Sequence, residues 1–301
     1  MTGWRLWAKA VRPYAYSASV VPIVVGGLYA RLEGADFAGL RFWAAVAAGV
    51  LMHTAANLWN DYFDFRHGVD RPGGGEGSGV LVRGEMSPGR CFRGAALCAA
   101  LALAIGLWLA WETPGWTIEA LMALGLAGAA FYSAGPASPK HRAFGEVWVF
   151  LFMGVGMTLG GYVVQAGSVS WSAVVAGVPA ALPMTALLFA NNLRDVRSDR
   201  AAGIKTLPMV LSPKASRLVL AGLLWGPYAL TGAMVACRRL PAATLAILLA
   251  VPAAVVWQRE ARKEPVGDAL VVGAARLHLF FGAAFAAGLW VAAALAERNA
   301  P

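Results

Sequence analysis

Charged side chains are scarce in this sequence. Asp, Glu, Lys and Arg make up 14% of its 301 residues, whereas hydrophobic residues make up 59%. Soluble domains carry about 25% charged residues, so this composition indicates a membrane protein. Cysteine is scarce as well: Cys91, Cys98 and Cys237 have no metal-ligand spacing, and they indicate neither a disulfide framework nor a zinc site.

Long apolar stretches, by contrast, recur along the whole chain. A membrane-spanning helix needs roughly 20 largely apolar residues, and the sequence therefore predicts an all-α, multi-pass membrane protein with nine transmembrane helices. We expect them to form one integral membrane domain over residues 1–301. The nine stretches lie at about 15–30, 42–60, 94–111, 117–132, 145–164, 171–190, 218–236, 241–257 and 277–295.

Basic residues indicate how the chain is oriented, because they concentrate in cytoplasmic loops. Nine spans put the two termini on opposite sides, and with the N-terminus inside, 20 of the 25 Lys and Arg residues fall on inner segments. The pattern predicts an inner (plasma) membrane protein with a cytoplasmic N-terminus. These loops also account for most of the net charge of +9, so we expect no nucleic-acid partner.

Acidic residues cluster where two of the apolar stretches end. Residues 60–70 (NDYFDFRHGVD) follow the second stretch and residues 191–207 (NNLRDVRSDRAAGIKTL) follow the sixth, so both belong to the predicted cytoplasmic face. Continued helices would place the polar side chains of each cluster on one helical face. The similar spacing of the two clusters fits two diverged helical repeats. The residues concerned are Asn57, Asp61 and Asp64 in the first cluster and Asn191, Asp195 and Asp199 in the second.

Converging carboxylates need cations between them. Asp oxygens without Cys or His neighbours suit Mg²⁺, which proteins usually hold through one or two carboxylates together with substrate phosphates. A lipid diphosphate bound to both clusters through Mg²⁺ would satisfy the charges, and the metal would stabilise the departing diphosphate. The predicted metal ligands are Asp61, Asp64, Asp70, Asp195, Asp199, Asn57 and Asn191. Those also predicted to be catalytic are Asp61, Asp64, Asp195 and Asp199.

Further polar residues beside the clusters are candidates for substrate contacts. Arg83, Arg194 and Lys205 would bind phosphate oxygens, although positive-inside placement alone also explains basic residues here. Asn57 and Asn191 would contribute amide oxygens, or merely cap and bridge helices.

Three more residues are candidates for the reacting end of the substrates. Tyr132 would face an allylic cation, or anchor the chain at the interface. His53 would orient the acceptor hydroxyl or take its proton, or simply be a hydrogen-bonded intramembrane histidine. Glu146 would touch the acceptor, or pair with Lys140 or Arg142.

The two acidic motifs resemble those of the UbiA superfamily of intramembrane aromatic prenyltransferases, which also has nine helices around a central cavity. The form NDxxDxxxGxD, with Gly68 and Asp70, is similar to the menaquinone branch, whose members prenylate 1,4-dihydroxy-2-naphthoate. SGVLVRGEMSP (78–88) and residues 132–146 are also in the style of that branch. The resemblance, which runs from Arg12 to about Leu211, implies Mg²⁺, a polyprenyl diphosphate donor and a hydroxylated aromatic acceptor.

Departures from the branch pattern leave other acceptors open. Ile204, Val210 and His141 stand where the branch usually has Lys, Arg and Tyr, while the aspartates are intact. The alternatives within the superfamily are 4-hydroxybenzoate, homogentisate, another dihydroxynaphthoate or a glycerophosphate lipid. A cation-coupled transporter would instead carry acidic residues deep within its spans, and an enzyme using a CDP-alcohol would carry all its aspartates in one motif. Sequence does not indicate the oligomeric state.

Overall fold

The computed structural model describes residues 3–72, 77–133, 138–263 and 266–298, and their regular structure is helical. The first half contains α1 (Gly3–Val11), η1 (Pro13–Ala15), α2 (Ser17–Leu32), α3 (Gly39–Arg66), α4 (Pro88–Glu112), α5 (Thr117–Ser133), η2 (Pro139–His141), α6 (Gly145–Val149), the π-helix η3 (Phe150–Gly156) and α7 (Met157–Ala166). The second half contains α8 (Trp171–Arg194), α9 (Val196–Ala201), α10 (Leu207–Val210), α11 (Pro213–Ala236), η4 (Ala242–Ala250), α12 (Val251–Glu260) and α13 (Asp268–Arg298). The prediction of an all-α fold is thus confirmed over the described residues.

Seven helices or continuous helical segments of the described chain are long and apolar enough to cross a membrane. An eighth results if the first helices and α2, which meet at a 49° bend, count as one span. The apolar helix Thr117–Tyr132 is shorter than a span requires. The predicted nine stretches therefore all lie in helical segments, but nine spans are not confirmed, because one segment is bent and another is short.

α8 lies at the centre of the bundle. Of its most apolar window, 67% is buried inside the protein, compared with 28–33% for the other six long spans. Two glycines let its neighbours α2 and α7 approach each other closely: a Cβ at Gly26 would clash with the Thr158 carbonyl oxygen, and one at Gly161 with that of Ile23. Such backbone proximity is how membrane helices gain packing contacts without a hydrophobic driving force.

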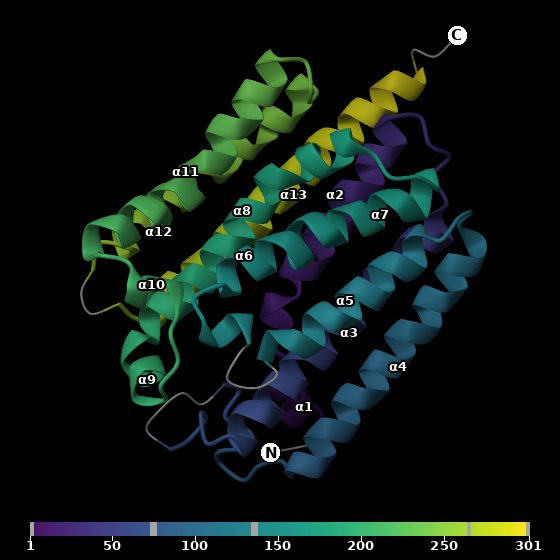
Figure 1. The fold of residues 1–301 in the computed structure, drawn as a ribbon. Helices are drawn as coiled ribbons and strands as arrows, with labels where there is room; N and C mark the ends of the chain where they lie inside the picture. The colour runs from purple at the N-terminus through teal and green to yellow at the C-terminus, as the bar shows by residue number, and fades with distance from the viewer. Residues whose placement is uncertain (1–2, 73–76, 134–137, 264–265, 299–301) are drawn as a thin grey trace.

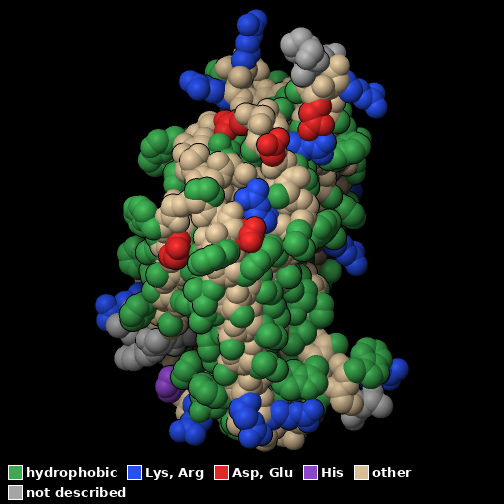
Figure 2. Space-filling view, turned by 90° about the vertical axis from the view of Figure 1, so that its right-hand side faces the viewer, with side chains coloured by type: hydrophobic (Ala, Val, Ile, Leu, Met, Phe, Trp, Pro, Cys, Tyr) green, Lys and Arg blue, Asp and Glu red, His purple; other side chains and the backbone are tan. Residues whose placement is uncertain are grey.

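The ends of α3 and α8 lie at the same end of the molecule. Figure 1 shows both helices running downward toward α1 and α9, while the last turns of α13 lie at the opposite, upper end. We call the lower end, defined by Asp61, Asp64, Asp195 and Asp199, the site end, and the upper end, defined by Glu33 and Glu297, the far end. In Figure 2 the middle of the molecule is covered mainly by hydrophobic side chains, and most charged ones lie toward the two ends.

Candidate active site

The first acidic motif occupies the last turns of α3 and the chain that folds back from it. Asp61 and Asp64 are only 2% and 4% exposed. The helix ends where Gly68 takes a left-handed conformation, with φ at +69°, which glycine adopts without strain. The backbone N–H of Asp70 then donates to the Asp64 carbonyl oxygen at 3.1 Å, so Asp70 lies beside the carboxylates of the helix.

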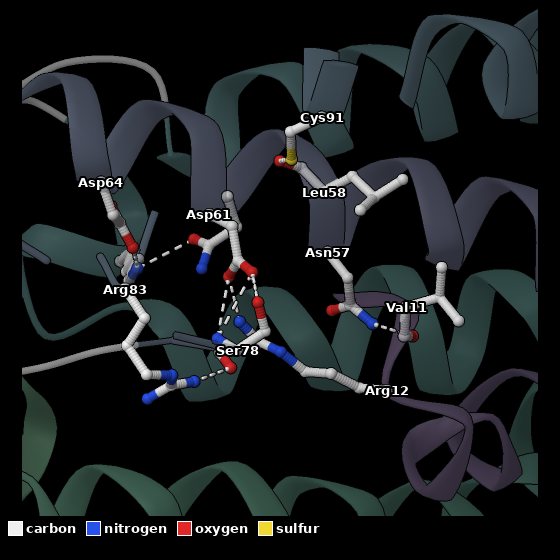
Figure 3. Close-up of polar contacts among 11 residues, drawn as sticks. Val11, Arg12, Asn57, Leu58, Asp61, Asp64, Ser78, Arg83 and Cys91 are labelled. Atoms are coloured by element: carbon white, nitrogen blue, oxygen red, sulfur yellow. Dashed lines mark hydrogen bonds and ion pairs between the residues drawn. The ribbon is translucent and has the colours of Figure 1, made fainter. Parts of the chain in front are cut away.

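Asp61 is bound by two segments from elsewhere in the chain. Arg12 Nη2 and Ser78 Oγ each donate to its carboxylate, and the Ser78 backbone N–H donates to it at 3.3 Å. Figure 3 shows both residues converging on Asp61. Arg12 sits at the bend before α2 with φ at +53°, a conformation that is uncommon for residues other than glycine and that persists only where surroundings enforce it.

Asp64 is bound by a residue of the loop that follows α5. Lys140 Nζ donates to Asp64 Oδ2 at 2.5 Å and to Asn60 Oδ1 at 2.8 Å. The loop itself is fastened to the second motif, since the Ala143 N–H donates to the Lys205 carbonyl at 2.7 Å. This backbone pairing holds Lys140 between the two motifs.

The second motif lies at the end of α8 and in α9. Arg194 Nε and Nη2 donate to the two oxygens of Asp195, each at 2.7 Å, and Nη2 also donates to Asn191 Oδ1 at 2.8 Å. Arg194 further pairs with Asp268 at 2.9 Å. Asp199, one turn beyond Asp195, has no such bidentate arginine among the described residues.

Electrostatics connects the two motifs. The pKa of Asp199 is raised to about 6, mainly by burial and in addition by the charges of Asp195 and Asp64, while Lys140 acts in the opposite direction. Burial likewise raises the pKa of Asp70 to about 7, with the negative charges of Asp64 and Asp61 adding to the effect. Carboxyls separated by more than 120 positions in the sequence therefore share one negative environment, in which Lys140 and Arg12 do not fully offset the acidic charge.

The donor set suits a hard divalent cation in its chemistry. All seven predicted ligands offer oxygen, as Mg²⁺ prefers. The pKa values of Asp70 and Asp199 are raised, first by burial and then by the charges of neighbouring aspartates, which a bound cation would offset. Within the described ranges, however, no three His, Cys, Asp or Glu side chains are grouped tightly enough to hold a metal. Arg12, Lys140 and Arg194 take the positions of counter-ions instead.

A cavity of about 670 Å³ adjoins the first motif. Its polar end is lined by Arg12, Asn57, Asn60, Lys140, Asn191 and Asn192. Beyond these it is mostly apolar and lies among α3, α4, α5 and the η3–α7 segment. Along α3 it extends from Asn60 back to Ala45, about 22 Å at 1.5 Å per residue. Its dimensions and polarity suit a long hydrocarbon with an anionic head.

The structure brings together most, but not all, of the residues singled out from sequence. Asn57, His53, Tyr132 and Asn191 line the cavity, and Asn57 Nδ2 also donates to the Val11 carbonyl at 3.4 Å. His53 Nδ1 lies 2.8 Å from Ser19 Oγ, which fits the structural alternative as well as the functional one.

The other nine predicted residues are not part of the cavity lining: five aspartates and Arg194 belong to the acidic motifs described above, and three more have other partners. Glu146 is buried and bonded to Asn192 rather than to Lys140 or Arg142. Arg83 donates to Glu85 and to the Ser78 carbonyl, and Figure 3 shows its guanidinium group beside Ser78. Lys205 is exposed in the loop paired with Arg142.

Sequence reasoning missed Arg12, Lys140, Ser78 and Asn192 as site residues. In the sequence Arg12 and Lys140 resemble ordinary cytoplasmic positive charges, although Arg12 precedes a proline at a break between apolar helices. Asn192 was overlooked beside Asn191, yet adjacent residues point about 100° apart on a helix, so both can face a site through different partners.

Comparison with known proteins identifies the family. The profile described as UbiA prenyltransferase family matches residues 19–281. UbiA prenyltransferase domain-containing protein 1 of Gallus gallus is 31% identical over 97% of this chain and 88% of its own length. The 1,4-dihydroxy-2-naphthoate octaprenyltransferase of Bacillus subtilis is 27% identical over 73% of this chain and 70% of its own. The expected menaquinone branch is therefore represented among the relatives but is not singled out.

Solved structures share the fold. A UbiA homolog from Archaeoglobus fulgidus bound to GPP and Mg²⁺ aligns with a TM-score of 0.65 at 17% identity, over 93% of this chain and 99% of its own. The apo structure of a UbiA homolog from Aeropyrum pernix aligns with a TM-score of 0.70 at 20% identity, over 93% and 98%. These findings do not favour a cation transporter. The chain belongs to the UbiA prenyltransferase family, and it is a prenyltransferase of the membrane-embedded, all-helical kind.

Proposed function

We propose that this enzyme transfers a polyprenyl group from a polyprenyl diphosphate to a hydroxylated aromatic acceptor, a dihydroxynaphthoate used in menaquinone biosynthesis. The observation that carries the proposal is a cavity whose polar end is lined by Arg12, Lys140 and asparagines of both acidic motifs, and whose apolar part runs along α3 for about 22 Å. A diphosphate head and a hydrocarbon tail have the same division of polarity.

The acidic motifs would hold the diphosphate from two sides through Mg²⁺. The ligands would be Asp61, Asp64, Asp70, Asp195 and Asp199, with Asn57 and Asn191 adding amide oxygens. When bound, Mg²⁺ supplies the Lewis acidity that stabilises negative charge on departing diphosphate. The relative from Archaeoglobus fulgidus, which is bound to GPP and Mg²⁺, supports this use of the site by analogy.

Basic side chains would exchange partners when the diphosphate binds. Arg12, Lys140 and Arg194 are paired with Asp61, Asp64 and Asp195. Once the carboxylates face metal, these cations become free to donate to phosphate oxygens. Arg83 and Lys205 do not line the cavity and would contribute mainly to the local positive potential.

Aromatic side chains of the cavity would stabilise the allylic cation that remains after diphosphate leaves. Tyr132, Trp148 and Phe152 all line the cavity, and Trp148 and Phe152 stack with ring centroids 4.5 Å apart. Trp148 Nε1 donates to the Gly128 carbonyl at 3.0 Å, which fixes the ring. The apolar walls would also exclude water, which would otherwise capture the cation.

The remaining features of the proposal rest on sequence. The first acidic motif resembles the menaquinone branch, and the Bacillus subtilis relative bears that branch's name. Basic-residue asymmetry supports a cytoplasmic N-terminus and an active site at the cytoplasmic face of the plasma membrane. The pattern of the two motifs supports one domain over residues 1–301, built from two diverged repeats.

The test is a competition assay on the purified protein in detergent. Mg²⁺ and polyprenyl diphosphates of graded length would be offered with 1,4-dihydroxy-2-naphthoate, its isomers, 4-hydroxybenzoate, homogentisate and a glycerophosphate lipid. The proposal expects a prenylated naphthol, identified by mass, and no product without Mg²⁺. If only a different acceptor were prenylated, the enzyme would still be a prenyltransferase, but the menaquinone assignment would be contradicted.

A further inference from the structure

Glu146 is a buried carboxylate that the diphosphate site does not use. It lies at the start of α6 and is 4% exposed. Its Oε1 accepts a hydrogen bond from Asn192 Nδ2 at 2.9 Å, and its Oε2 has no hydrogen-bond partner among the described residues. A buried carboxylate that is only half satisfied is costly, so its position in the fold needs an explanation.

The partnership fixes which way the Asn192 side chain faces. The NH₂ group of Asn192 faces Glu146, the orientation that an ionised carboxylate requires because it accepts hydrogen bonds and cannot donate them. The amide is planar and carries its oxygen on the opposite side. Asn192 lines the cavity, and the part of the chain that the structure describes offers its Oδ1 no hydrogen-bond donor. Glu146 therefore holds Asn192 as a hydrogen-bond acceptor for something in the cavity.

The surroundings indicate where that ligand would lie. Tyr132 also lines the cavity, and its hydroxyl is 3.7 Å from where a Cβ on Gly145, the residue before Glu146, would be. Asn191, the neighbour of Asn192, is engaged instead with Arg194 of the diphosphate site. The two adjacent asparagines thus have different partners: Asn191 is bonded to Arg194 of the second acidic motif, and Asn192 to Glu146.

We infer that Asn192, held by Glu146, forms the subsite that accepts a hydrogen bond from the phenolic hydroxyl of the prenyl acceptor. The inference rests on the proposed function and deepens it. An amide oxygen binds a hydroxyl donor and leaves an ether or a carboxylate unpaired, so the subsite selects phenols. Asn192 contacts the acceptor, and Glu146 is a positioning residue that acts through Asn192.

The first test compares a phenolic acceptor with its O-methyl ether, both of which carry an activated ring. For the wild type the ratio of kcat/KM values should favour the phenol. Asn192→Ala should lower this ratio roughly tenfold, the value of one hydrogen bond of about 1 kcal/mol or slightly more, and raise the KM for the acceptor. The KM for the polyprenyl diphosphate should stay within about twofold in the same assay. An unchanged ratio in Asn192→Ala would overturn the inference.

A charge exchange tests the positioning role of Glu146. Asn192→Asp alone would set two carboxylates against each other and weaken acceptor binding. Glu146→Gln alone would no longer define the amide orientation, because glutamine can donate or accept. The double variant E146Q/N192D should recover much of the phenol preference, since the introduced glutamine would donate to one oxygen of the introduced aspartate and leave the other oxygen for the hydroxyl. Additive losses in the double variant would contradict the positioning role.

Two controls separate the possible failures. Gln165→Ala removes another partly enclosed amide, one that bonds only the Ala38 backbone and does not line the cavity, and it should leave the ratio unchanged. Mg²⁺-dependent binding of a non-reacting thio analogue of the diphosphate verifies that each variant is folded. If the wild-type protein prenylates no phenol, both the proposed function and the inference are contradicted. If the wild type is active and the variants keep its preference for the phenol, only the inference is contradicted.

Discussion

The two ends of the bundle differ in how deeply their acidic side chains are buried. At the far end Glu33 is exposed and accepts hydrogen bonds from Tyr162 and Ser172, both at 2.6 Å. At the site end Asp61 and Asp64 are almost fully buried and are paired with Arg12 and Lys140. Exposed ion pairs and acids contribute little to stability, whereas buried ones carry a desolvation penalty of several kcal/mol per ion.

The difference indicates which carboxylates would gain most from binding a cation. A carboxylate that water can solvate gains little from a metal, while a buried one whose charge is only partly offset gains a great deal. At the site end burial raises the pKa values of Asp70 and Asp199, and the charges of neighbouring aspartates raise them as well. The same logic predicts that substitutions at the site end alter catalysis strongly and that matched substitutions at the far end do not.

The largest effect is expected for Asp61→Asn. Asparagine keeps the shape and the contact with Ser78 but removes the charge that offsets Arg12 and that would hold Mg²⁺. We expect kcat to fall roughly 10³-fold, in line with the loss of a group that stabilises transition-state charge. Turnover in detergent measures it, with Glu33→Gln as the far-end control. If Asp61→Asn turns over as fast as the wild type, the acidic residues of the two ends do not differ in their effect on catalysis.

A smaller effect is expected for Lys140→Met, which keeps the length of the side chain and removes its charge. Asp64 and Asn60 lose a donor at 2.5 and 2.8 Å, and the diphosphate loses a candidate ligand. A hydrogen bond to a charged group contributes about 1.5–3 kcal/mol, so the KM for the polyprenyl diphosphate should rise by about one order of magnitude or more. Partial recovery in Lys140→Arg would support a role of charge, and an unchanged KM would contradict it.

A change of chain-length preference is expected for Gly125→Leu. Gly125 lines the cavity, and a Cβ there meets no atom within 4 Å, so the leucine would fill space that the hydrocarbon tail needs. Long polyprenyl diphosphates should lose about tenfold in kcat/KM relative to short ones. Gly222→Leu on α11, which has equal room but no place in the cavity lining, is the matched control. Equal responses of the two variants would refute the tail-binding cavity.

The smallest effect is expected for Glu297→Gln at the far end. Glu297 pairs with Arg31 at 2.7 Å, but its side chain is 54% exposed. Water and salt replace such a pair readily, so activity and the thermal midpoint should both match the wild type. A clear loss of turnover would show that the far end is coupled to the site.

The sequence was sufficient to predict the helical segments and to place the two acidic motifs at the same end of the bundle, while their joint action on a diphosphate stays a prediction. The length of the apolar stretches defines the helices. Asp61 and Asp195 stand out because acidic residues are rare at the ends of apolar runs. The far-reaching partners could not be predicted, because Arg12 meets Asp61 only through the bend before α2, and Lys140 reaches Asp64 through a loop that is fastened to Lys205. Both contacts are set by tertiary packing, which local pattern does not encode.

The same limit explains the count of spans and the role of Glu146. The first predicted span, about 15–30, corresponds to α2, which has only 16 residues and passes as a span only together with the helices before the 49° bend. Glu146 was expected to contact the acceptor or a nearby basic residue, and only the fold shows that it reaches Asn192 on another helix.

The central claim is that the two acidic motifs act together on one diphosphate. The most direct measurement is the Mg²⁺-dependent binding of a non-reacting thio analogue of a polyprenyl diphosphate to wild type, Asp64→Asn and Asp199→Asn, with EDTA as the metal-free reference. The account predicts tight binding by the wild type only with Mg²⁺, and loss of this Mg²⁺-dependent binding in each variant. Undiminished binding in either variant would show that one motif suffices and would contradict the claim.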